Sequence, residues 1–134
     1  MSTMTSTEPI DVVEAIYDAM ATKDLHRILE LIDPGVVIQQ DPALPWGGRF
    51  EGHDGLAEFG RIIGGRIESA VTIESMFQAG EHVVQHGRTA GTVRATGVPF
   101  DIAECHVWRV VAGKAVEARY FIDSAAMLEA LGAS

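Results

Sequence analysis

The chain has little cysteine, little positive charge and no long hydrophobic run. Cys105 is the only cysteine in 134 residues, which excludes an internal disulfide and suits a reducing, cytoplasmic setting. Ten Lys and Arg against 19 Asp and Glu give a net charge of −9, which repels nucleic acids and anionic lipids. No apolar run approaches the roughly 18 residues of a membrane span. We therefore expect neither nucleic acid nor a membrane as partner.

Sequence signatures of bound cofactors are missing too. The glycines within 47–52 and 60–65 match neither the dinucleotide-binding nor the P-loop spacing. His82 and His86 stand four residues apart in a predicted strand, which separates them by about 13 Å, too far to share one metal ion. The sequence thus predicts no cofactor and no metal.

The hydrophobic pattern predicts an α+β fold. Length and a 47% hydrophobic content indicate a flexible tail over 1–8 and a single domain over 9–134. Helical spacing gives way along the chain to runs rich in β-branched and aromatic residues. The predicted order is α-α-β-α-β-β-β-β, with helices over 9–20, 25–32 and 55–63, strands over 36–40, 71–78, 82–95, 100–111 and 114–122, and a final helical turn or two over 124–131.

Three aspartates stand at expected helix starts, namely Asp24, Asp54 and Asp123. Short turns between the last four strands predict an antiparallel meander whose one face is covered by helices. Long strands of this kind twist and curl. The wedge between helices and a curled sheet is expected to hold either a pocket or a solid core.

Acid–base chemistry is the catalysis for which the sequence offers residues. Asp41 follows an apolar strand and precedes Pro42; it is either a general base with a raised pKa at a cavity mouth or the first residue of a turn. Tyr17 lies on an apolar helix stripe, where its hydroxyl faces a cavity or takes one buried partner. Tyr120 is expected to face the helices.

The predicted strand over 100–111 has chemically different side chains on its two faces. Glu104, His106 and Trp108 share one face, and Cys105 lies on the other. The pattern does not say which face is inward.

Several segments together resemble the nuclear transport factor two-like superfamily. They are the helix with Tyr17, the joint at 23–25, the stretch 36–42, the glycines of 47–52 and the stretch 106–123. The closest similarity is to polyketide cyclases of the SnoaL type and to relatives of ketosteroid isomerase. The resemblance implies a cone-shaped roll, a strongly bent antiparallel sheet on three helices around an apolar pocket, and a homodimer.

The resemblance also implies roles for individual residues. Asp41 matches the general base of the isomerases, and Tyr17 matches an oxyanion donor. Their second donor falls on Cys105, whose thiol donates weakly. His106 is a third catalytic candidate.

The sequence analysis therefore predicts a cofactor-free enzyme that transfers a proton next to a carbonyl, by isomerisation or aldol-type cyclisation. Its ligand would be a small apolar or polycyclic carbonyl compound. Arg88 would bind a polar group of this ligand, and the pocket walls would include Trp46, Phe59, Trp108 and Tyr120.

Two other functions stay open. A non-catalytic ligand-binding or association module can use the same fold. An epoxide hydrolase is disfavoured, since Arg88 matches the arginine of that family but Ala90 and Tyr120 stand where its two aspartates belong.

Overall fold

The computed structural model describes residues 8–132 and contains four helices and six strands. Apart from Glu8, the predicted tail lies outside the described residues. The elements are α1 (Pro9–Ala21), α2 (Leu25–Leu31), β1 (Ile32–Gln40), β2 (Gly48–Glu51), α3 (Gly52–Arg66), β3 (Ile67–Ala79), β4 (His82–Val93), β5 (Pro99–Val111), β6 (Lys114–Ile122) and α4 (Ser124–Ala130).

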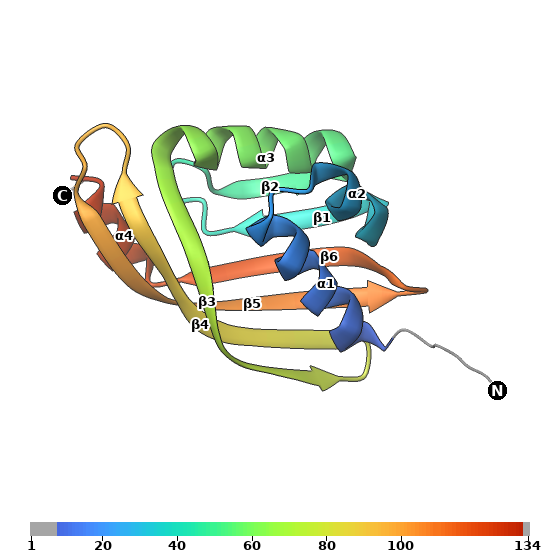
Figure 1. Ribbon diagram of the computed structural model, residues 1–134. Coiled ribbons are helices and arrows are strands. Elements are labelled where there is room, and N and C mark those ends of the chain that lie inside the picture. Colours follow the sequence, from blue (N-terminus) through green and yellow to red (C-terminus); the bar gives the residue numbers. More distant parts are fainter. Residues whose placement is uncertain (1–7, 133–134) are drawn as a thin grey trace.

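The strands form one sheet in the order β2-β1-β6-β5-β4-β3 (Figure 1). The predicted meander of β3 to β6 is confirmed, since each of these strands pairs antiparallel with the next. One pairing in the sheet is parallel, since β1 runs in the same direction as β6, with Gln40 beside Tyr120. The short strand β2, which no pattern predicted, pairs antiparallel with the side of β1 that faces away from β6, and it forms one edge of the sheet.

The sheet bends where β3 and β4 lie side by side. A bulge shifts the register between Ile73 and Ser75, and bulges increase local bending. Gly87 and Gly91 of β4 lie so close to β3 that an added Cβ would overlap the backbone oxygens of Thr72 and Glu68. These two glycines let β3 cross tightly over β4 and curl the sheet.

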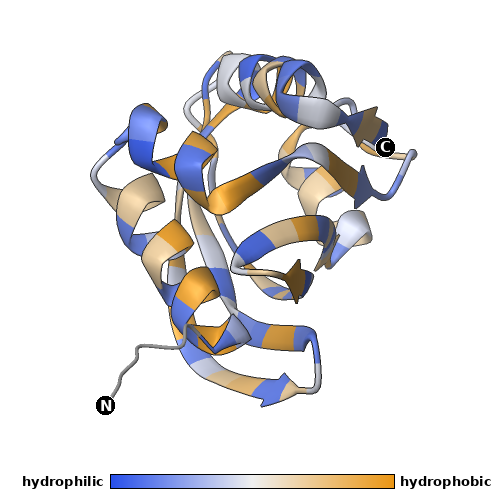
Figure 2. Ribbon diagram, turned by 90° about the vertical axis from the view of Figure 1, so that its right-hand side faces the viewer, coloured by the Kyte–Doolittle hydropathy of each residue, from blue (hydrophilic) through white to orange (hydrophobic). Residues whose placement is uncertain are grey.

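Helices α1, α2 and α3 lie on the concave side of this curved sheet (Figure 1). Helix α1 contacts β3, β4, β5 and β6, whereas α3 contacts β1, β2 and β3. A view from the side shows strands and helices surrounding one interior (Figure 2). The α+β cone predicted from the sequence is confirmed, and its curvature places a cavity between sheet and helices.

Two of the three predicted helix caps are confirmed. The side chains of Asp24 and Asp123 accept hydrogen bonds from the N–H groups of Arg27 and Ala126. The prediction for Asp54 is wrong, because β2 leads directly into α3. The helix begins at Gly52, and Asp54 lies within its first turn. Within residues 8–132 no helix combines the length and the apolar character needed to span a membrane.

Candidate functional site

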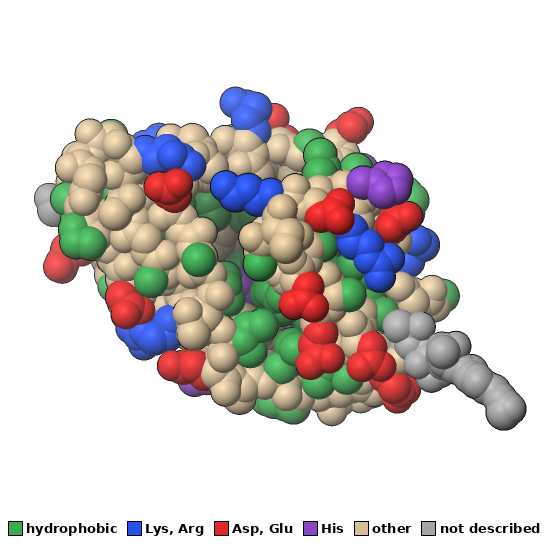
Figure 3. Space-filling model, in the orientation of Figure 1, with side chains coloured by type: hydrophobic (Ala, Val, Ile, Leu, Met, Phe, Trp, Pro, Cys, Tyr) green, Lys and Arg blue, Asp and Glu red, His purple; other side chains and the backbone are tan. Residues whose placement is uncertain are grey.

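A cavity of about 170 Å³ lies between α1, α3 and the curved sheet. The molecule is visibly hollowed there, with hydrophobic side chains inside the hollow (Figure 3). Six of the nine site residues predicted from the sequence line this cavity, namely Tyr17, Trp46, Phe59, His106, Trp108 and Tyr120. Since a cavity of about 150 Å³ holds benzene, this one has room for a ligand of one or two rings.

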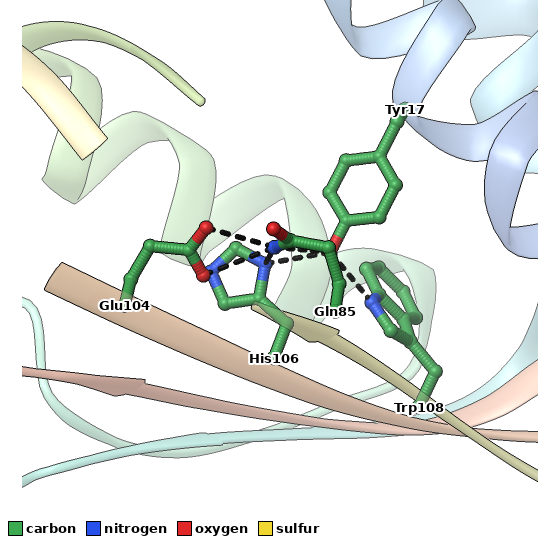
Figure 4. Close-up of polar contacts among 5 residues, drawn as sticks. All are labelled: Tyr17, Gln85, Glu104, His106 and Trp108. Carbon is green, nitrogen blue, oxygen red and sulfur yellow. Dashed lines mark hydrogen bonds and ion pairs between the residues drawn. The ribbon is translucent and has the colours of Figure 1, made fainter. Parts of the chain in front are cut away.

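A polar cluster forms part of the cavity wall (Figure 4). The Tyr17 hydroxyl lies 2.7 Å from His106 Nδ1. It accepts hydrogen bonds from Trp108 Nε1 at 2.9 Å and from Gln85 Nε2 at 3.2 Å. The Glu104 carboxylate lies 3.2 Å from His106 Nε2 and accepts from Gln85 Nε2 at 2.8 Å. These five residues join α1 to β4 and β5.

The donors in this cluster determine where its protons lie. Trp108 Nε1 and Gln85 Nε2 can only donate. Gln85 Nε2 also lies 3.3 Å from His106 Nδ1, but its two N–H groups serve the shorter contacts to Glu104 and Tyr17, so that Trp108 and Gln85 together use the lone pairs of the Tyr17 oxygen. The Tyr17 proton is then directed to Nδ1 of His106. A neutral imidazole that accepts at Nδ1 carries its proton on Nε2, where Glu104 accepts it. The arrangement is a tyrosine–histidine–glutamate relay that ends at the cavity.

Burial disfavours the charged forms of Tyr17 and His106. It lowers the pKa of His106 to about 4 and raises the pKa of Tyr17, against the hydrogen bonds from Trp108 and Gln85. The Glu104 side chain is fully enclosed, and burial raises its pKa as well. At neutral pH His106 is therefore an uncharged imidazole, and Tyr17 keeps its proton.

Strand alternation explains which side chains reach this cluster. On β5, Glu104, His106 and Trp108 point inward and Cys105 points to the opposite face. The face that the sequence pattern left open is thereby assigned. Gln85 of β4 pairs with His106 across the ladder, and so its buried amide meets the same cluster.

Asp41 lies outside the cavity, on an exposed groove beside Pro42 and Phe121. Its carboxylate accepts a hydrogen bond from the Ala43 N–H at 2.9 Å. That bond, with a further one from the Ser124 hydroxyl, lowers the pKa of Asp41. The predicted raised pKa at a cavity mouth is wrong, because a satisfied and solvated carboxylate favours its charged form.

Arg88 and Cys105 also lie away from the cavity. The Arg88 guanidinium donates to the Asp101 carboxylate at 2.6 Å and to its backbone oxygen at 2.9 Å, near the surface. The hydrogen bond to Asp101 raises the pKa of Arg88. The half-buried thiol of Cys105 faces away from His106 because adjacent strand residues point to opposite sides. Neither side chain can contact a ligand in the cavity.

Sequence reasoning did not select Gln85 or Glu104 as site residues. The alternation pattern placed Glu104 beside His106 on one strand face, which was a usable signal once that face was known to be inward. Gln85 gave no signal, because its contact with His106 depends on the pairing of β4 with β5. Within residues 8–132, no three His, Cys, Asp or Glu side chains gather as metal ligands would.

A strongly curved sheet over helices with a cavity between them is the architecture of NTF2-like proteins. The chain belongs to the SnoaL-like family, whose domain model matches residues 13–118. The resemblance inferred from the sequence is thereby confirmed. No curated protein matches the chain.

Three solved structures illustrate the relationship. An NTF2-like protein of unknown function from Burkholderia pseudomallei K96243 is 26% identical, with a TM-score of 0.86 over 95% of this chain and 98% of that one. One from Burkholderia thailandensis E264 is 27% identical, with a TM-score of 0.87 over 94% and 98%. TerC, co-crystallised with polyporic acid, is 22% identical, with a TM-score of 0.85 over 92% and 98%.

Proposed function

We propose that the protein is an enzyme that moves a proton at the carbon next to a carbonyl group, using its own side chains alone. The observation that carries this proposal is the 2.7 Å contact between the Tyr17 hydroxyl and Nδ1 of His106 at the cavity wall. A proton donor and an acceptor thus meet beside an apolar space. Enolisation needs an acceptor for the proton of the C–H group and a donor to the carbonyl oxygen. These two groups of the substrate are neighbours, so the donor and the acceptor of the enzyme must be neighbours as well.

The proposed step uses the relay in sequence. The carbonyl oxygen of the bound ligand replaces Nδ1 of His106 as acceptor of the Tyr17 hydroxyl proton. The freed lone pair of Nδ1 takes the proton from the neighbouring carbon, and the C–H electron pair moves toward the carbonyl oxygen. The resulting enolate is stabilised by Tyr17. Glu104 stabilises the imidazolium through Nε2, and return of the proton to another carbon completes an isomerisation.

Neighbouring donors strengthen Tyr17 as a proton donor. Trp108 Nε1 and Gln85 Nε2 direct partial positive charge at the phenolic oxygen. Both hydrogen bonds lower the pKa of Tyr17 against the larger effect of burial. A histidine with a pKa of about 4 is a weak base, so most of the rate enhancement must come from stabilisation of the enolate oxygen.

His106, rather than Asp41, is the base in this proposal. His106 lines the cavity next to Tyr17. Asp41 uses its carboxylate to hold a turn, which is the other role that the sequence left open for it.

The proposed ligand is uncharged and has one or two rings. The cavity volume of about 170 Å³ supports this size. No Lys or Arg stands among the described residues that line the cavity, so a ligand carboxylate would lose its hydration without a partner. The co-crystal of TerC with polyporic acid supports ligand binding by proteins of this fold.

The test is deuterium exchange at the carbons next to the carbonyl of 2-tetralone, a two-ring ketone, followed by proton NMR in D₂O. The protein is expected to accelerate exchange, and Tyr17→Phe and His106→Asn are each expected to slow it roughly 100-fold or more. Cys105→Ala changes the residue between Glu104 and His106 on the other strand face, and it should exchange at the wild-type rate. Equal rates for the protein and for His106→Asn would contradict the proposal.

A ligand-binding module is the second candidate function. The apolar cavity favours it equally, because binding requires no proton transfer. If 2-tetralone binds but its exchange is not accelerated, the module interpretation replaces the enzyme.

A further inference from the structure

We propose that the hydroxyl group of Tyr120 donates a second hydrogen bond to the carbonyl oxygen of the ligand, beside the bond from Tyr17. This inference rests on the proposed function, since it concerns the same cavity and the same ligand oxygen. It adds a donor to the step in which the enolate forms. Tyr120 is then a catalytic residue and not only part of the cavity wall.

The Tyr120 ring lies in the cavity, against the proposed base. Tyr120 is 8% exposed and lines the cavity. Three other cavity side chains surround its ring, with centroid distances of 4.6 Å to His106, 5.6 Å to Phe59 and 5.7 Å to Trp108. Tyr120 also borders the outer groove that contains Asp41. Its ring contacts are all on the cavity side, however, and the hydroxyl group stands at the far end of that ring.

The hydroxyl group of Tyr120 is free to bind a ligand. Within residues 8–132 it makes no hydrogen bond, and none contributes to its pKa, which burial and charge on Tyr17 raise. Its oxygen is also not one of the fully enclosed polar atoms without a partner, which belong to Gln40, Trp46 and Gln85. It therefore borders open space. Buried tyrosine hydroxyls generally have a partner, and here the cavity leaves room for the ligand to supply one.

Tyr17, the other tyrosine, shows the contrast. Its oxygen accepts hydrogen bonds from Trp108 and Gln85, and its proton is directed to Nδ1 of His106. This hydroxyl group has to give up one partner when it donates to a ligand. Tyr120 has no hydrogen bond to exchange, so a bond from Tyr120 to the ligand is gained without the loss of another.

His106 brings both phenol groups to the same part of the ligand. The Tyr17 hydroxyl lies 2.7 Å from Nδ1 of His106, and the Tyr120 ring packs edge-on against the same imidazole. In the proposed step the C–H group of the ligand has to reach Nδ1, which places the adjacent carbonyl group beside both phenols. Negative charge on Tyr17 raises the pKa of Tyr120, as expected for two neighbouring oxygens.

A second donor suits the chemistry of the step. A carbonyl oxygen has two lone pairs, and the negative charge of an enolate strengthens hydrogen bonds to both. Tyr17 supplies one donor and Tyr120 the other. The ligand proton still passes from carbon to Nδ1 of His106, while the Tyr120 O–H bond stays intact, because burial raises the pKa of Tyr120. The weak base makes stabilisation of this oxygen decisive.

The first test uses wild-type protein labelled with ¹³C at the ζ carbon of tyrosine. The chain contains two tyrosines, so two signals report on the two hydroxyl groups, and the spectrum of Tyr17→Phe assigns them. With 2-tetralone the Tyr120 signal is expected to move downfield, because its hydroxyl gains an acceptor. Tetralin has the same two rings without the carbonyl group and should move this signal much less. Equal movement with both ligands would overturn the inference.

The second test removes the hydroxyl group and observes 2-tetralone labelled with ¹³C at its carbonyl carbon. Tyr120→Phe keeps the ring and its packing. The signal of the bound carbonyl should move upfield from its position in wild type, toward the value in an apolar solvent. Deuterium exchange should slow roughly tenfold or more, mainly in kcat. An unchanged carbonyl signal contradicts the inference, and if this variant does not fold, the tyrosine signals of wild type still decide.

Arg119→Gln is the matched control for Tyr120→Phe. Arg119 precedes Tyr120 on β6, and its exposed side chain lies on the opposite face of the strand. Both the carbonyl signal and the exchange rate should remain at their wild-type values. An equal effect of Arg119→Gln and Tyr120→Phe would assign the change to the strand rather than to the hydroxyl group, and it would overturn the inference.

The outcomes separate this inference from the proposed function. A carbonyl signal that depends on the Tyr120 hydroxyl, without catalysed deuterium exchange, supports the hydrogen bond and removes the enzyme proposal. Catalysed exchange that is equally fast in Tyr120→Phe, with an unchanged carbonyl signal, overturns the inference and leaves the enzyme proposal standing. Failure of 2-tetralone to bind overturns both.

Discussion

Burial disfavours the protonated, charged form of His106. Its pKa is lowered by burial to about 4 from an ordinary value of 6.5. Between these pH values the unfolded chain binds a proton on this imidazole and the folded protein does not. The contribution of His106 to the free energy of unfolding is therefore complete above pH 6.5 and is lost as the pH falls toward 4.

A pH series of urea unfolding tests this linkage. Glu104 contributes with the opposite sign, because a raised carboxyl pKa makes the folded protein bind its proton first. Comparison with His106→Asn isolates the histidine. The wild-type free energy of unfolding, relative to that variant, should decrease by roughly 2 kcal/mol between pH 7 and pH 4.5. A difference that stays constant over this range would contradict a buried neutral His106.

Asp41→Asn is the second test at the residue scale. The asparagine keeps an oxygen that can accept from the Ala43 N–H, so the turn should form. Deuterium exchange of 2-tetralone is expected to stay within a few-fold of wild type, because Asp41 does not line the cavity. A loss of roughly 100-fold would restore Asp41 as the base.

Individual site residues differed in how far the sequence predicted them. Tyr17 stood on an apolar helix stripe and Tyr120 was expected to face the helices, and both line the cavity. Trp108 lines it too, although the pattern left open which face of its strand is inward. Gln85 and Glu104 are polar, and burial of a polar side chain is decided by its partners across the sheet rather than by its own hydropathy. The polar half of the relay therefore required the structure.

Helices and long strands were predicted because their apolar residues repeat with different periods, near 3.6 and 2 residues. The pairing of distant strands could not be predicted from the sequence in the same way. Residues 32–40 pair with residues 115–120 in parallel, and no local signal connects segments so distant. Strand β2 is four residues long, too short for a repeat to show.

The bend between β3 and β4 gives a prediction at the element scale. Gly91→Ala would bring a Cβ against the backbone oxygen of Glu68, and this overpacking should lower the free energy of unfolding by roughly 1 to 3 kcal/mol. Gly64→Ala is the matched control, since its position in α3 is open and alanine favours helix by up to about 1 kcal/mol. Urea unfolding measures both variants. Equal stability of Gly91→Ala and wild type would show that the bend does not need this glycine.

The outer face of the sheet leads to a prediction for the whole molecule. Phe77 is 55% exposed and Phe121 is 52% exposed. The pairing of the strands places them on one face with Val84, Cys105 and Val107, which are partly exposed. Exposed apolar clusters of this kind mark protein contacts. We predict a homodimer through this face.

Analytical ultracentrifugation tests the dimer. Phe121→Glu is expected to give monomers, because a charge would be buried in the contact. Leu25→Glu on α2 is the control, since that side chain is 64% exposed and lies on a helix rather than on the sheet. A monomeric wild-type protein, or a dimeric Phe121→Glu, would contradict the prediction.

The pH dependence of 2-tetralone exchange tests the central claim, that the buried neutral His106 is the base. The rate constant is expected to stay level between pH 8 and pH 6 and to fall only as the pH approaches 4, following the lowered pKa of His106. His106→Asn should exchange at close to the uncatalysed rate, and its rate constant should show no decrease near pH 4. A rate that already halves near pH 6.5, the ordinary histidine value, or one that is equally fast in His106→Asn, would contradict the account.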